Sequence, residues 1–311
     1  MSGGVRGLDG IADPLAAPHE RTLEIVAELR QARRRLESGP SARVLLPTIR
    51  AFSRIEDQLD HPLRVALVGE FNSGKSTLAN LLARTESLPT AVVSNTRIPT
   101  LLCYAREPTI WVLDEHGSRV ALRADQRDLP ASIVRLEVGL PTQRLRRMQL
   151  LDLPGFADPK FRGPGIDTAV HDVHAVLWCT MSTQAWKESE RTIWERLPAR
   201  LRARALLVAT HADLLHDARD ADKLLHRLRR EGGPLFQGVV LIATQDALAL
   251  ARQHQEVDSE TWRATGADVL EAALFQLLLD LREQRADAAL KITRRIADRA
   301  ALQLGGPPAR G

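Results

Sequence analysis

The residues best suited to chemistry form a glycine-rich loop, GEFNSGKS, at residues 69–76. Its spacing is G-x-x-x-x-G-K-[ST], in which the glycines let successive backbone N–H groups turn toward phosphate oxygens. Lys75 supplies a mobile positive charge for the β- and γ-phosphates, and the Ser76 hydroxyl is a ligand for Mg²⁺. The alternative is a glycine turn with an incidental surface lysine. The residues that we predict to bind a nucleotide here are Gly69, Glu70, Phe71, Asn72, Ser73, Gly74, Lys75, Ser76 and Thr77.

A second motif, Asp152-Leu153-Pro154-Gly155, directly follows the apolar stretch MQLL. A carboxylate at a strand end that faces the phosphates can hold Mg²⁺ through water, so we assign this role to Asp152. Gly155 can offer its N–H to the γ-phosphate, and the segment beyond it can then sense that phosphate. The alternative is a plain turn.

The segment SNTRIPT lies between these two motifs and contains Thr96, which we predict to complete the metal shell. Thr90 and Thr100 are rivals for that role, and a simple loop threonine is the alternative. The residues to which we assign catalysis are Lys75, Ser76, Thr96 and Asn72. The predicted metal ligands are Ser76, Thr96 and Asp152.

A base-reading motif is expected at Thr210-His211-Ala212-Asp213, where the pattern [NT]-K-x-D has histidine in place of lysine. A carboxylate at Asp213 accepts hydrogen bonds from N1–H and the N2 amine of guanine. Adenine lacks that amine and has an acceptor at N1, so it would leave the carboxylate unpaired. The alternative for Asp213 is a helix N-cap. A further apolar run, VVLIAT, ends at Ala243-Thr244-Gln245, and this small-residue loop is expected near the guanine O6.

Six short, continuous apolar runs predict the strands that position these motifs, because strands buried on both faces of a parallel sheet have this pattern. Helical stretches lie between several of the runs, which favours an α/β fold with a doubly wound, mostly parallel sheet. Residues 108–140 indicate antiparallel strands with a hairpin around His116-Gly117. The six runs are residues 63–68, 100–104, 149–151, 175–179, 205–209 and 239–243.

Helical patterns flank this region at residues 20–37, 41–59 and 266–304. Their apolar stripes predict a small helical bundle. The alternative is that the last helix lies on a membrane surface, because residues 281–304 carry six basic and three acidic side chains. The predicted division is a flexible tail at 1–19, bundle helices at 20–61, a nucleotide-binding domain at 62–265, a C-terminal helix at 266–304 that completes both parts, and a tail at 305–311.

The composition excludes several classes of protein. With 311 residues, 44% hydrophobic and 26% charged, the chain is neither wholly disordered nor collagen-like. Aromatic residues make up 4%, which disfavours nucleic-acid binding by base stacking. Cys103 and Cys179 match no zinc spacing. Without a signal peptide or an apolar run of roughly 18 residues, we expect a cytoplasmic protein whose membrane contact is at most peripheral, at the inner membrane surface.

Together the motifs resemble the dynamin superfamily, in particular bacterial dynamin-like proteins. The stretches that carry the resemblance are GEFNSGKSTLANLLA, LPTAVVSNTRIPT and EVGLPTQRLRRMQLLDLPGF. The resemblance implies a P-loop GTPase domain with helices before and after it that form a bundle. It also implies GTP hydrolysis to GDP with Mg²⁺, and pairing of GTPase domains as a homodimer or with another dynamin-like protein, often at a membrane.

The sequence departs from the family pattern at Phe71 and Asn72, and at His211, which makes guanine selectivity less certain. Many eukaryotic members place a catalytic glutamine where this chain has Phe71 and a serine where it has Asn72. Small GTPases of the Ras type place a water-orienting glutamine where this chain has Phe156. We therefore expect slow turnover until dimerisation or a partner completes the site. Two other functions stay open: a GTP-binding scaffold with little hydrolysis beside a longer dynamin-like partner, and a ribosome-assembly GTPase, although no RNA-binding motif is found.

Overall fold

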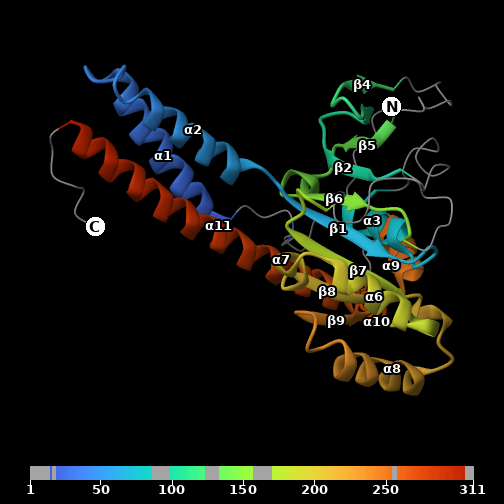
Figure 1. Ribbon diagram of the computed structural model, residues 1–311. Helices are drawn as coiled ribbons and strands as arrows, with labels where there is room; N and C mark the ends of the chain where they lie inside the picture. The colour runs from blue at the N-terminus through green and yellow to red at the C-terminus, as the bar shows by residue number, and fades with distance from the viewer. Residues whose placement is uncertain are drawn as a thin grey trace. The chain divides into compact units, whose positions relative to one another are not determined.

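Figure 1 shows the computed structural model, which describes residues 15, 19–85, 98–122, 133–156, 170–253 and 258–304. Two compact units divide these residues. The sheet unit holds Leu15 and residues 63–277, and the helical unit holds residues 19–62 and 278–304. Helix α11 (Ala267–Gln303) is continuous and contributes to both units.

The described residues of the sheet unit form one sheet of nine strands in the order β4-β3-β5-β2-β6-β1-β7-β8-β9. The strands β6, β1, β7, β8 and β9 run parallel to one another. This arrangement confirms the predicted α/β fold with a mostly parallel sheet. The strands are β1 Leu63–Gly69, β2 Thr100–Tyr104, β3 Thr109–Asp114, β4 Arg119–Ala121, β5 Ile133–Leu140, β6 Met148–Asp152, β7 Ala175–Met181, β8 Ala205–Thr210 and β9 Gly238–Leu241.

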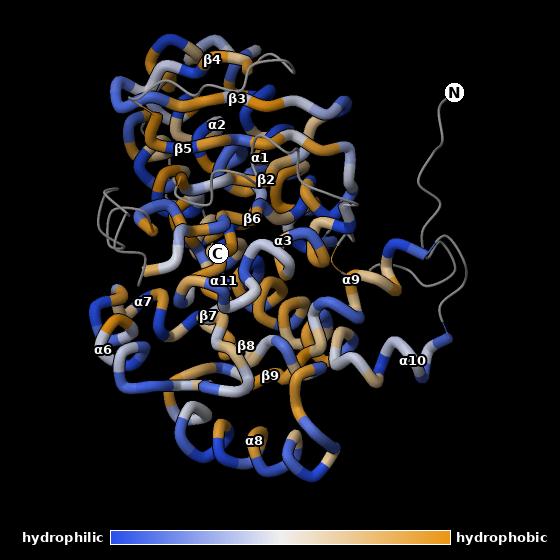
Figure 2. Tube along the Cα trace, turned by 90° about the vertical axis from the view of Figure 1, so that its right-hand side faces the viewer, coloured by the Kyte–Doolittle hydropathy of each residue, from blue (hydrophilic) through white to orange (hydrophobic). Residues whose placement is uncertain are grey.

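Helices and short helical turns connect the strands of the sheet unit. The helices wholly within this unit are α3 Lys75–Ala83, α6 Glu188–Arg196, α7 Ala199–Arg202, α8 Ala218–Glu231, α9 Thr244–Arg252 and α10 Ser259–Ala264. Figure 2 shows the outer helix α8 as mostly hydrophilic, with hydrophobic residues at intervals. Leu224 and Leu228 of α8 are buried in the core, so the helix is amphipathic.

An aromatic cluster fills the core on one face of the sheet. Trp178 of β7 lies 5.5 Å from Trp194 of α6 and 6.1 Å from Trp186, measured between ring centroids. Phe236 lies 4.1 Å from Trp194. All four side chains are buried, so these tryptophans and Phe236 are part of the core.

Two details differ from the sequence-based predictions. Strand β2 runs parallel to β5 but antiparallel to β6, although its apolar run predicted a parallel strand. The second helix begins at Leu46, not at residue 41. Pro47 lies in its first turn, where the missing N–H costs no hydrogen bond; a helix from residue 41 would place the proline ring in its interior. Residues 41–45 form turns instead, and the Ser41 carbonyl accepts the N–H of Val44.

The helical unit consists of α1 (Glu20–Ser38), α2 (Leu46–Asp60) and the second half of α11. One apolar core joins the three helices, which agrees with the predicted bundle. Ion pairs from Arg33 to Glu56 and from Arg21 to Asp287 tie α1 to the other two helices. The core residues are Ile25, Val26, Leu29, Phe52, Ile55, Leu59, Ala286 and Ala289.

Candidate nucleotide-binding site

The glycine-rich loop joins the carboxyl end of β1 to the first turn of α3, which is the ordinary place for phosphate binding in such sheets. Gly69 approaches β7 so closely that an added Cβ would lie 2.1 Å from the Cys179 carbonyl oxygen. Asn72 and Gly74 have φ values of 60° and 77°, in the left-handed region that glycine and asparagine adopt most readily. The residue types of the loop therefore match its backbone.

Lys75 is buried at the start of α3, and its ammonium group is held by the loop itself. Its Nζ donates to the Glu70 carbonyl at 2.7 Å and contacts Ser73 Oγ at 3.4 Å. Burial lowers the pKa of Lys75, and the nearby Asp152 carboxylate opposes that change. A buried cation with few anionic neighbours favours an anionic ligand such as a phosphate.

Ser76 and Asp152, two of the residues that we assign to the metal, meet across the site. Ser76 Oγ donates to Asp152 Oδ2 at 2.6 Å. The second oxygen, Oδ1, is buried and has no hydrogen-bond partner among the described residues. Burial raises the pKa of Asp152, because a charged carboxylate is poorly solvated there. These hydroxyl and carboxylate oxygens fit Mg²⁺, which prefers hard oxygen ligands and keeps several waters.

Gly155 brings the Asp-Leu-Pro-Gly segment against the glycine-rich loop. An added Cβ at Gly155 would lie 2.5 Å from the Phe71 nitrogen, so only glycine allows this approach. The next residue, Phe156, has its N–H 3.4 Å from the Gly69 carbonyl oxygen, and its ring lies 5.4 Å from Trp178. The segment that would sense a γ-phosphate is thus anchored to the aromatic core at its start.

The two predicted base-reading segments lie at the carboxyl ends of neighbouring strands, β8 and β9. The Ala212 N–H donates to the Ile242 carbonyl at 3.1 Å, which joins the segment of Asp213 to the segment of Ala243 and Thr244. Thr210 Oγ1 donates to the Ser73 carbonyl at 2.9 Å and so links this end of the site to the phosphate loop.

His211 also lies beside the phosphate loop. Its Cε1 would be 3.1 Å from a Cβ added at Gly74, and its Nδ1 lies 2.8 Å from Thr210 Oγ1. The Asp213 side chain is exposed, which leaves it open to a ligand. Ala243 and Thr244 are buried, and the Thr244 hydroxyl has no partner among the described residues.

Other predicted residues lie elsewhere. Thr96 and its rival Thr90 fall outside the described residues. Thr100 lies in β2 directly opposite Asp152, and its hydroxyl donates to the Ile98 carbonyl at 3.2 Å. Thr77 is half-buried in α3, and Asn72 is exposed. Phe71 is also exposed, with 53% of its surface accessible, and carries no polar group that could orient water.

Sequence reasoning missed a polar link between the phosphate loop and the start of α6. Glu70 accepts hydrogen bonds from Lys187 Nζ at 2.9 Å and Ser189 Oγ at 2.7 Å. One turn further, the buried Glu190 accepts from Thr180 Oγ1 and the Lys187 N–H, both at 2.9 Å. Glu70 and its partner Lys187 are more than a hundred positions apart in the sequence. No local sequence pattern could therefore have predicted this contact.

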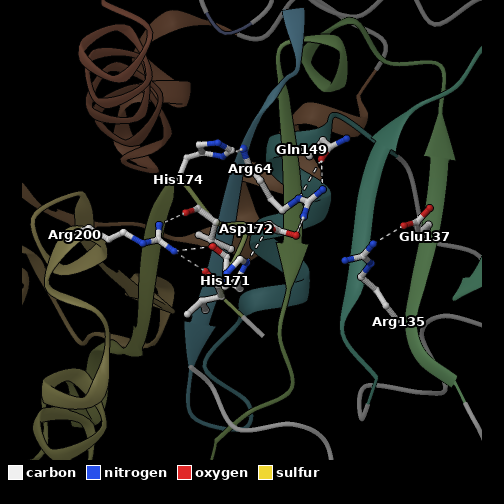
Figure 3. A network of polar contacts seen from close by, with 10 residues as sticks. Arg64, Arg135, Glu137, Gln149, His171, Asp172, His174 and Arg200 are labelled. Atoms are coloured by element: carbon white, nitrogen blue, oxygen red, sulfur yellow. Dashed lines mark hydrogen bonds and ion pairs between the residues drawn. The ribbon is translucent and has the colours of Figure 1, made fainter. Parts of the chain in front are cut away.

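Figure 3 shows a different polar network, at the amino ends of the strands and therefore at the opposite edge of the sheet from the phosphate loop. The Arg64 N–H donates to His174 Nδ1 at 2.9 Å, and His171 pairs with Asp172. Arg200 donates to the backbone carbonyls of residues 170, 171 and 173. The two histidines therefore serve structural contacts. The described residues contain no group of three or more His, Cys, Asp or Glu side chains that could hold a metal ion by themselves.

Comparison with known proteins agrees with the geometry of the site. The sequence model of the dynamin family matches residues 65–131. Dynamin-like protein 2 of Campylobacter jejuni is 29% identical over 197 residues, which are 61% of this chain and 32% of that protein. The isoniazid-induced protein IniC of Mycobacterium tuberculosis is 34% identical over 111 residues, which are 33% of this chain and 22% of that protein. The chain thus spans about a third or less of the length of these curated relatives.

Solved structures show the same fold at low sequence identity. One is from an oligomerised bacterial dynamin pair described as a mechanism for long-range sensing and tethering of membranes; it has a TM-score of 0.64 and 15% identity, over 91% of this chain and 56% of that one. A second, described in the same terms, has a TM-score of 0.52 and 20% identity, over 82% of this chain and 41% of that one. In its phosphate loop, its fold and these matches, the chain is similar to the dynamin family and to bacterial dynamin-like proteins.

Proposed function

We propose that this chain binds GTP with Mg²⁺ and hydrolyses it to GDP and phosphate. The observation that carries the proposal is the Ser76–Asp152 hydrogen bond of 2.6 Å, which leaves a buried carboxylate oxygen unsatisfied close to Lys75. Mg²⁺ would be held by Ser76, through water by Asp152, and by Thr96. When bound, it neutralises charge that develops on the phosphates.

Residues of the protein itself bind the phosphates and the base. Lys75 offsets negative charge on the β- and γ-phosphates, and the backbone N–H groups of residues 69–76 hold the phosphate oxygens in position. Gly155 contacts the γ-phosphate through its N–H. Asp213 selects guanine, while Thr210 and His211 support the base beside the loop. The segments around Ala243 and Thr244 close the other side of the base.

We further propose that hydrolysis is slow in the monomer. The exposed Phe71 and the core-packed Phe156 offer no polar group to a water molecule. GTPases that await a partner residue turn over at about 10⁻⁴ to 10⁻² per second. A second GTPase domain, in a homodimer or from another dynamin-like chain, would supply the polar group that positions the water molecule. The oligomerised bacterial dynamin pair, described as tethering membranes, supports this assembly and its place at a membrane surface. We expect the assembly to lie on the cytoplasmic side of that membrane.

The test is GTP turnover measured over a wide range of protein concentrations, with Lys75→Ala as the inactive control. Turnover per molecule that rises with concentration supports activation by self-association. Turnover of several per second in a sample shown to be monomeric would contradict it.

A scaffold that binds GTP but barely hydrolyses it is a second candidate, and the exposed, apolar Phe71 favours it. Tight GTP binding with negligible turnover at every protein concentration would support the scaffold function over GTP hydrolysis. Adding a longer dynamin-like chain to the same assay then tests whether such a partner restores hydrolysis.

A further inference from the structure

Glu70 connects the phosphate loop to three other parts of the sheet unit. Its backbone carbonyl accepts the ammonium group of Lys75 at 2.7 Å. Its side chain accepts hydrogen bonds from Lys187 Nζ at 2.9 Å and Ser189 Oγ at 2.7 Å, at the start of α6. The peptide that follows it lies against Gly155, where an added Cβ would be 3.0 Å from the Glu70 carbonyl carbon. A shift of Glu70 would therefore move both the partner of the Lys75 ammonium and the contact with Gly155.

The start of α6 is fixed by the core of the sheet unit. Lys187 is the N-cap residue of this helix, and its backbone N–H donates to the buried Glu190 at 2.9 Å. Glu190 also accepts from Thr180 of β7, at 2.9 Å. The residue before the N-cap, Trp186, is buried in the aromatic cluster, and its N–H donates to Thr180 Oγ1 at 3.1 Å. The side chain of Lys187 therefore extends toward Glu70 from a backbone that is hydrogen-bonded to the core.

Trp186 has an uncommon backbone conformation. Its φ of 60° lies in the left-handed region, which is unfavourable for a bulky residue. Residues that the surrounding structure holds in this region are concentrated at active sites and ligand-binding segments. The residue after this bend is Lys187, whose ammonium group reaches the phosphate loop. The strained bend thus lies at the point from which Lys187 is directed to the loop.

The contact between Lys187 and Glu70 has an electrostatic consequence for the loop. Partial burial raises the pKa of Glu70, but the hydrogen bonds from Lys187 and Ser189 outweigh this effect, so the pKa lies below its usual value. The carboxylate is therefore charged at neutral pH, and a charge of this sign repels phosphates bound beside it. The Lys187 ammonium group offsets that charge. The two side chains are 40% and 20% exposed, and ion pairs at such positions contribute little to the stability of the fold.

We propose that Lys187, assisted by Ser189, is a positioning residue for the triphosphate. Its charged hydrogen bond fixes the Glu70 side chain, which keeps the Glu70 carbonyl on the Lys75 ammonium group. It also neutralises the one carboxylate within the phosphate loop. Lys187 acts through Glu70 and not by contact with the nucleotide. This inference rests on the proposed function, because it assigns a residue that supports binding of the same phosphates.

Amide hydrogen exchange of the nucleotide-free full chain tests whether the contact holds the loop in place. Lys187→Met removes the ammonium group and keeps an unbranched apolar side chain. We expect the amides of residues 70–76 to exchange about fivefold faster or more in this variant, while exchange in β7 and β8 is unchanged. The matched control is Lys223→Met, because Lys223 of α8 forms a similar ion pair with Asp220, at 3.1 Å. The control should leave exchange in the loop as in the wild type.

Affinity for a non-hydrolysable GTP analogue with Mg²⁺ tests the effect on the ligand. We expect Lys187→Met to weaken binding by about tenfold, and Lys187→Arg to stay within about twofold of the wild type because it keeps a charged donor. Adding Glu70→Gln to Lys187→Met should recover about threefold of the loss, since the unneutralised carboxylate is then absent. A merely structural role for Lys187 would not produce this recovery. Thermal melts of each variant show that the fold is intact.

Unchanged loop exchange in Lys187→Met would overturn the proposal, as would an equal change in Lys223→Met. A double variant that binds the analogue more weakly than Lys187→Met alone would also contradict it, because the two residues would then act separately. The exchange measurement needs no nucleotide. If the wild type binds no guanine nucleotide, the proposed function fails, and loop exchange still decides whether Lys187 holds the loop.

Discussion

The two oxygens of Asp152 have different surroundings, since Oδ2 accepts the Ser76 hydroxyl and Oδ1 is buried without a partner among the described residues. The structure thus keeps a charge-bearing group where burial disfavours its charge. Such an arrangement lowers the stability of the ligand-free protein and raises its affinity for a cation complex.

We therefore expect Asp152→Asn to have opposite effects on the stability of the ligand-free protein and on the binding of GTP with Mg²⁺. Without ligand, the melting temperature should stay equal or rise, because a poorly solvated charge is removed. Binding of GTP with Mg²⁺ should weaken by about tenfold or more. Thermal melts with and without Mg²⁺–GTP measure both effects. A variant that melts lower and binds normally would contradict the assigned role.

The exposed carboxylate of Asp213 carries the proposed choice of base. We expect Asp213→Ala to weaken GTP binding by about 100-fold, because two hydrogen bonds to guanine are lost, and to leave ATP binding nearly unchanged. Titration with fluorescent guanine and adenine nucleotides measures the ratio. His211→Lys, which restores the residue usual at that position, is the matched variant and should keep the preference for GTP. Equal loss for both nucleotides in Asp213→Ala would contradict the role assigned to this residue.

At the scale of elements, buried ionic contacts hold α3, the turn at residues 143–146 and α11 together. Glu271 of α11 accepts from the buried Arg144 at 2.8 Å and from Arg84, at the end of α3, at 2.9 Å. We expect Glu271→Ala to lower the free energy of unfolding by about 3 kcal/mol, because it leaves a buried guanidinium without this carboxylate. Urea unfolding measures it. The exposed Glu260→Ala is the control and should change stability by less than about 0.5 kcal/mol.

Helix α6 places Glu190 in the core, where burial raises its pKa despite hydrogen bonds from Thr180 and Lys187. A raised pKa in the folded state means that the folded protein holds this proton more tightly than the unfolded chain does. The contribution of Glu190 to stability is therefore complete below the unfolded pKa, near 4.5, and falls as pH rises toward the folded pKa.

The Glu190→Gln variant cannot ionise, so it should lack this part of the pH dependence. We expect the stability of the wild type relative to Glu190→Gln to be greatest at acidic pH and to decline as pH rises above about 4.5. Urea midpoints followed by tryptophan fluorescence over this range give the comparison. A difference between the two proteins that is constant with pH would show that Glu190 keeps an ordinary pKa.

Much of the sheet could be predicted because strands buried on both faces leave continuous apolar runs, and the bounds of β2 were predicted to the residue. The direction of β2 could not be predicted, because an apolar run indicates that a strand is buried but not whether its neighbouring strands are parallel or antiparallel to it. The glycine-rich loop was predictable since its chemistry is local. The contact of Glu70 with Lys187 and Ser189 was not, because it depends on how two distant elements meet in space.

At the scale of the whole molecule, the chain combines a sheet unit and a helical unit that share α11. The helical unit is polarised, with most of its acidic side chains at one end and most of its basic side chains at the other. The sheet unit holds those described residues to which we assign nucleotide binding.

The central claim is that the loop at residues 69–76 holds a guanine nucleotide with Mg²⁺. Isothermal titration calorimetry on the folded wild type, with GTP and ATP in turn and Mg²⁺ present, tests it most directly. We predict saturable heat with GTP, little with ATP, and none for Lys75→Ala with GTP. The absence of binding heat with every guanine nucleotide, at several temperatures, in a protein shown to be folded would contradict the account.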